Sequence, residues 1–148
     1  MEALMTAIVL WLSANFDLPG IQEHPRIEFA SEARIVAQRY RGLAGGQLAG
    51  SEPAGSEQRI VAVYDDAAKT ILLREGWTGA TPAELSVLVH EMVHHLQNVG
   101  KLKFACPQER EQVAYRAQER WLRLFGRDLQ RDFQIDAFSL LVKTKCMY

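Results

Sequence analysis

The segment His90-Glu-Met-Val-His94 lies within a continuous helical pattern and decides how the rest of the chain is interpreted. Thr81 is a suitable N-cap, Pro82 suits the first helical position, and Glu84 is spaced to complete a capping box. Gly100 is expected to end the helix. The sequence therefore predicts one long helix between Thr81 and Gly100, with the His-Glu-x-x-His motif inside it.

The spacing of the two histidines suits metal binding. In an α-helix, positions i and i+4 differ by about 40° in azimuth, so the imidazoles of His90 and His94 reach one ion. Glu91 lies about 100° further round, where its carboxylate contacts a water on the metal without being a ligand. We predict a Zn²⁺ site with Glu91 as the catalytic base; a chance match on an ordinary amphipathic helix is the alternative. His95 points away from His94, and we expect it to be a supporting or surface residue.

One ligand is missing from this helix, because catalytic zinc usually takes three protein ligands and one water. An extension of the motif to a third histidine is excluded, since Gln97 and Gly100 occupy the required positions. A downstream carboxylate is therefore expected. Glu109 falls in the first turn of a helix predicted to begin at Pro107, where the helix dipole alone favours it. The full set of candidates is Glu109, Glu111, Glu119, Asp128, Asp132 and Asp136.

Helical phase favours Glu111 among these carboxylates. It shares one face with Tyr115, Gln118 and Leu122, and Ala114 beside it is small enough for two helices to approach closely. We predict that Glu111 is the third ligand; a solvated surface glutamate is the alternative. Tyr115 lies one turn further on. It is a candidate oxyanion donor, and a buried core tyrosine is an equally good interpretation.

The remaining patterns predict an α+β fold. Strand signals, helix signals and one glycine-rich loop alternate along the chain. The expected elements are a helix carrying Leu4, Ile8, Trp11 and Leu12, a strand at Arg26–Phe29, a helix at Ala33–Tyr40, a loop at Gly42–Ser56, a hairpin of Arg59–Asp65 with Thr70–Arg74, a helix from Pro107 to about Gly126, and further helix within Asp128–Tyr148.

Composition limits the domain count and the partners. A chain of 148 residues with 48% hydrophobic content suits a single domain, residues 1–148, with one core. The net charge is -1, from 17 basic and 18 acidic side chains, which argues against a nucleic-acid partner. No apolar run reaches the roughly 18 residues of a membrane-spanning helix. The oligomeric state is left open.

Two cysteines, Cys106 and Cys146, are too far apart in sequence for a zinc site built on closely spaced pairs. A disulfide and two buried thiols both remain open. The N-terminal segment carries no basic residue before Arg26, unlike a secretory signal. If the cysteines are bridged, a periplasmic or secreted location is favoured, with any signal lying upstream of this sequence.

The helix motif, together with Glu111-Gln-Val-Ala114, resembles the gluzincin group of zinc metallopeptidases. The segments Thr78–Gln97, Cys106-Pro107 and Ala114–Leu122 are similar to small bacterial proteins assigned to the minimal gluzincins. The resemblance covers roughly half of the chain. It implies a supporting helix, a small sheet whose edge strand flanks a cleft, the motif helix and a glutamate helix. It also implies zinc-dependent hydrolysis of peptide or protein substrates.

Three functions follow as hypotheses. The leading one is a zinc peptidase in which His90, His94 and Glu111 hold the metal. A zinc-binding or peptide-binding module without catalysis is the main alternative, and a metal-free helical protein is the third. Trp77, a short turn before the motif helix, is expected either to line the cleft or to belong to the core.

Overall fold

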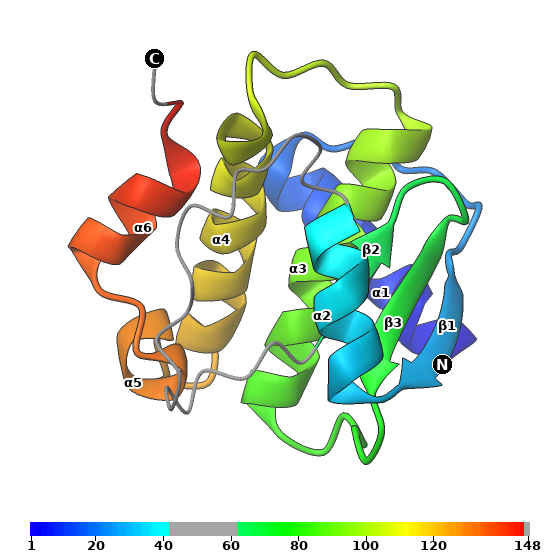
Figure 1. Cartoon of the computed structure of the whole chain (residues 1–148), viewed down its shortest axis with the longest axis horizontal. Helices are drawn as coiled ribbons and strands as arrows, with labels where there is room; N and C mark the ends of the chain where they lie inside the picture. The colour runs from blue at the N-terminus through cyan, green and yellow to red at the C-terminus, as the bar shows by residue number, and fades with distance from the viewer. Residues whose placement is uncertain (42–61, 147–148) are drawn as a thin grey trace.

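The computed structural model describes residues 1–41 and 62–146 and has the predicted α+β fold (Figure 1). The predicted loop at Gly42–Ser56 and the first residues of the expected hairpin lie outside this range. The elements are α1 (Glu2–Phe16), β1 (Arg26–Ala30), α2 (Glu32–Arg41), β2 (Ala62–Asp65), β3 (Thr70–Arg74), α3 (Pro82–Val99), α4 (Pro107–Arg123), α5 (Leu129–Phe133) and α6 (Ala137–Thr144).

The three strands form one mixed sheet in the order β1-β3-β2. The predicted hairpin is confirmed, because β2 pairs antiparallel with β3, while β1 pairs parallel with β3 on its other side. Both faces of β3 are covered. Ile71 and Leu73 join the main core with α1 and α3, whereas Leu72 packs with Ile35 of α2 on the opposite face. Helices therefore enclose the central strand from both sides (Figure 1).

Helix α1 supports the back of the core. Its buried residues include Ile8, Val9 and Leu12, and Leu4 and Trp11 pack against the same cluster. This spacing confirms the amphipathic helix predicted for the N-terminal segment.

Helix α3 begins at the predicted cap, although the capping contacts differ from those expected. The Thr81 hydroxyl accepts a hydrogen bond from the Glu84 amide at 3.1 Å, as predicted. The Glu84 carboxylate, however, accepts from the Ala80 amide and from the Thr78 hydroxyl, and not from the Thr81 amide. The preceding turn thus supplies two donors to Glu84.

Gly100 ends α3, as predicted, and it does so without a left-handed conformation of its own. Its φ is -78°, outside the left-handed region, and the next residue, Lys101, takes the left-handed conformation at φ 55°. A Cβ atom at Gly100 would lie 2.7 Å from Cγ of Pro19 and 2.8 Å from the carbonyl oxygen of Leu96. Glycine is required there by close packing against the loop after α1.

A disulfide between Cys106 and Cys146, 40 positions apart, joins the start of α4 to the end of α6. Of the two alternatives left open by the sequence, the bridge is the one found. Among the described residues, no helix is both long and apolar enough to cross a membrane.

Reducing this disulfide is expected to lower the free energy of unfolding by about 4 kcal/mol, because a loop of this length gains entropy in the unfolded chain. The melting temperature should fall by on the order of 10 °C. Calorimetry with and without reductant measures the change, and the intact mass should rise by that of two hydrogen atoms. Two thiols that react freely with an alkylating reagent in the native, non-reduced protein would contradict the bridge.

Candidate metal centre

Helices α3 and α4 lie side by side (Figure 1) and bring three donor side chains together. Nε2 of His90 lies 2.9 Å from Oε2 of Glu111, and Nε2 of His94 lies 3.1 Å from Oε1 of the same carboxylate. One ligand atom from each of the three residues falls within 4.8 Å of the others. Within the described parts of the chain this is the one such group, and it could hold a metal ion.

Small side chains let the two helices approach closely enough for this contact. Ala114 and Ala117 of α4 are both fully buried. Ala114 lies three positions after Glu111, near the same face of the helix, so no large side chain separates the carboxylate from α3. The packing expected from the sequence is found.

A glutamine on α4 orients the first histidine. The Nδ1 atom of His90 lies 3.0 Å from Oε1 of Gln118, and Nε2 of Gln118 donates to the Ser86 hydroxyl at 3.2 Å. Since the amide oxygen only accepts, Nδ1 of His90 carries the proton in this contact. Nε2 is then directed at Glu111, as a metal ligand requires.

A second glutamine, Gln97 of α3, orients the ring of His94. Nδ1 of His94 lies 2.9 Å from Oε1 of Gln97, whose Nε2 donates to the Arg110 carbonyl oxygen at 3.0 Å. The Arg110 guanidinium also donates to Gln97, and it is held by a bidentate ion pair with Asp66 in the turn between β2 and β3. The position of His94 therefore depends on the sheet as well as on α3.

The Glu111 carboxylate is held in its charged form. Burial raises the pKa of Glu111, but attraction to His94 and hydrogen bonds from both histidines outweigh it, so the pKa lies well below its usual value. For His94, burial lowers the pKa, and the Glu111 carboxylate reverses the shift to a net increase. A negative oxygen donor between two imidazoles is a donor set that suits Zn²⁺.

Replacing Gln118 with methionine is expected to weaken metal binding by about 10- to 100-fold, since His90 loses the partner that fixes its ring. Metal affinity measured with a competing chelator gives the ratio. Gln108→Met is the matched control, because Gln108 lies on the same helix, is only partly buried and belongs to no candidate metal group among the described residues. Equal affinities of Gln118→Met and the control would show that this hydrogen bond does not position His90.

Glu91 lies beside the three donors without belonging to them. Its side chain is buried, and no hydrogen bond to its carboxylate is formed by the residues the structure describes. The carboxylate is therefore not committed to a structural partner within that part of the protein.

Tyr115 packs against the centre, with its ring 4.6 Å from that of His90 in an edge-to-face contact. The Arg39 guanidinium of α2 lies close enough to Tyr115 to act on its pKa. Burial and the nearby Glu111 carboxylate raise the pKa of Tyr115, so the phenol keeps its proton.

The expectation for His95 is wrong, because it neither lies at the surface nor supports the metal group. Its side chain is fully buried, with Nδ1 3.0 Å from the Tyr64 hydroxyl and Nε2 2.6 Å from the Glu23 carbonyl oxygen. These partners tie α3 to the sheet and to the segment before β1. Burial lowers the pKa of His95, which favours the neutral ring.

The other carboxylate candidates have structural partners of their own. Glu109 accepts from the Ala105 amide, in keeping with its position in the first turn of α4. Glu119 pairs with Arg123 and accepts from the Leu129 amide. The three aspartates cap short helices or pair with arginine: Asp128, Asp132 and Asp136.

Sequence reasoning missed the part that Arg39 and Gln97 have in this centre. Arg39 carries no local signal, because a basic residue in the last turn of a helix is explained by the helix dipole alone. Gln97 follows His94 by three positions, a spacing at which two side chains meet on a helix, so the i, i+3 rule offered a signal.

The family model for a domain of unknown function, DUF6647, matches residues 1–148, and the chain belongs to that family. No curated protein and no solved structure matches the chain.

Proposed function

We propose that this member of the DUF6647 family is a zinc-dependent peptide hydrolase, with His90, His94 and Glu111 as the metal ligands. The observation that supports the proposal is the convergence of two Nε2 atoms and one carboxylate beside Glu91. Two imidazoles and one carboxylate form a common ligand set of catalytic zinc, which leaves a fourth position open. The resemblance to minimal gluzincins agrees with this assignment.

The side chains divide the chemistry among them. Zinc would supply Lewis acidity, lowering the pKa of water and polarising the peptide carbonyl. Glu91 takes the proton of the attacking water and delivers it to the leaving amine. Tyr115 is the proposed oxyanion donor, because its ring contacts that of His90 and its raised pKa keeps the phenolic proton in place.

Protein purified without added metal is expected to contain about one zinc ion per chain and to cleave members of a broad peptide library. Elemental analysis and mass spectrometry of the library measure the two properties. Absence of zinc together with no gain of activity on its addition would overturn the proposal. Bound zinc without turnover would favour the non-catalytic binding module.

We also propose a periplasmic or secreted location. The Cys106–Cys146 disulfide supports it, because such bonds persist mainly in oxidising compartments. Fractionation of the native host, with detection by an antibody, tests the location.

A further inference from the structure

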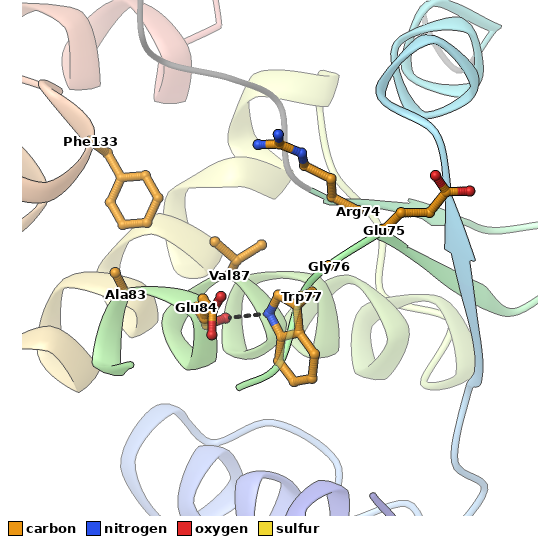
Figure 2. Close-up of a pocket in the computed structure, with 8 residues that line it drawn as sticks. All are labelled: Arg74, Glu75, Gly76, Trp77, Ala83, Glu84, Val87 and Phe133. Carbon is orange, nitrogen blue, oxygen red and sulfur yellow. Dashed lines mark hydrogen bonds between the residues drawn. The ribbon is translucent and has the colours of Figure 1, made fainter. Parts of the chain in front are cut away.

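A pocket of about 430 Å³ opens along the first half of α3 (Figure 2). This volume falls in the range of ligand sites in proteins. The side chains of Trp77, Val87 and Phe133 give it apolar walls, and the indole N–H of Trp77 is fixed by a 3.0 Å hydrogen bond to the Glu84 carbonyl oxygen. Trp77 thus lines a cavity while also packing against the main core, so it has both of the roles considered for it.

The pocket adjoins the candidate metal centre. Val87 lies three positions before His90 on α3, which corresponds to a rise of about 4.5 Å along the helix. On the other wall, Phe133 packs against the cluster that contains Tyr115, and the Tyr115 ring contacts His90. A peptide held at the metal centre would therefore have the pocket within reach of a neighbouring residue.

One charged group at the pocket is available to a ligand. Arg74, at the end of β3, is half-buried and extends over α3 on the side of Phe133 (Figure 2). No ion pair to Arg74 is formed by the described residues. The two acidic side chains do not compensate it, because Glu84 is bonded to the turn before α3 and Glu75 points away in this view.

We propose that this pocket is a substrate subsite that takes a bulky apolar side chain next to the scissile bond, while Arg74 binds a carboxylate of the same peptide. The inference rests on the proposed peptidase function and narrows its substrate class. A half-buried guanidinium favours a carboxylate partner, since the planar fork matches its two oxygens. The carboxylate comes either from the peptide C-terminus or from an acidic side chain.

Binding of short blocked peptides tests the subsite directly. The protein is zinc-loaded Glu91→Gln, in which the probes should not be cleaved, and affinities are measured by calorimetry. Acetyl-Ala-Leu with a free carboxylate is expected to bind about tenfold more tightly than acetyl-Ala-Ser, from burial of the leucine side chain. Equal affinities of these two probes would overturn the apolar subsite.

Two matched pairs identify the source of the carboxylate. Acetyl-Ala-Leu is compared with its C-terminal amide, and acetyl-Ala-Leu-Asp-amide with acetyl-Ala-Leu-Asn-amide. At least one acid is expected to bind about tenfold more tightly than its neutral partner, in line with a charged hydrogen bond. The pair that shows the difference gives the source. No difference in either pair would overturn the role of Arg74.

Arg74→Gln should abolish the preference for the acid. Arg26 is an exposed arginine at the other end of the paired strands, and the control Arg26→Gln should keep that preference. A preference that survives in Arg74→Gln would also overturn the assignment. Each affinity ratio compares two matched peptides on protein in the same metal state, and every ratio is measured once with zinc-loaded protein and once with chelator-treated protein. Failure of zinc binding or turnover therefore counts against the peptidase alone, while failure of the ratios counts against the subsite alone.

Discussion

Replacing Glu111 with alanine is expected to remove zinc from the purified protein. The loss of affinity should exceed the roughly 10- to 100-fold typical of changing a residue that only hydrogen-bonds to a metal ligand. The carboxylate lies between Nε2 of His90 and Nε2 of His94, and it supplies the only negative charge in the proposed ligand set. Without it, two neutral imidazoles would have to hold a divalent ion in a buried site. Elemental analysis and chelator competition measure the loss.

Glu109→Ala is the matched control, because it removes a carboxylate from the same helix two positions away. Glu109 accepts from the Ala105 amide and, among the residues that the structure describes, belongs to no group that could hold a metal ion. The control should keep its zinc while losing some helix stability through the weakened N-terminus. Wild-type zinc occupancy in Glu111→Ala would show that the third ligand is another residue.

Local helix geometry explains how much of the centre could be predicted. The i, i+4 spacing fixes His90 and His94 on one face whatever the rest of the fold does, so the pair is readable from sequence. Glu111 required one more step, the face that it shares with Tyr115, Gln118 and Leu122 beside the small Ala114. The structure brings Glu111, Ala114 and Gln118 against α3. The assignment of the two histidines and that of Glu111 both depend on the spacing of residues within a few turns of a single helix.

Contacts between distant segments were not readable in this way. Arg39 approaches Tyr115 from α2, and Asp66 holds Arg110 from the turn between two strands. Each of these two contacts depends on how the sheet is placed over α3, and the hydrophobic periodicity of the sequence does not predict that placement. The pocket has the same origin, because Trp77, Val87 and Phe133 come from three separate segments.

One local prediction gave the wrong environment. His95 was expected at the surface or near the metal, but its side chain is fully buried and contacts the Tyr64 hydroxyl and the Glu23 carbonyl oxygen. Gly100 ends α3 as predicted, but the packing of Pro19 where its Cβ would lie was not part of that prediction. In both cases tertiary packing from residues far away in sequence decided the local structure.

Glu91→Gln is expected to keep the zinc and lose the turnover. Zinc bound only to the folded state stabilises it by about 4 kcal/mol when free zinc is a thousand times the dissociation constant. Chelation should then lower the melting temperature of the wild type by on the order of 10 °C. Glu91→Gln should show the same shift, because Glu91 lies beside the ligand group and not in it.

The rate should fall by about 100- to 10,000-fold in the same variant, since glutamine fills the space but accepts no proton. His90→Ala and His94→Ala should lose both the metal-dependent shift and the turnover. Calorimetry with and without chelator, alongside peptide cleavage assays, separates the two properties. If Glu91→Gln loses the shift as completely as the histidine variants, then Glu91 coordinates the metal, and a mechanism in which it carries the proton is wrong.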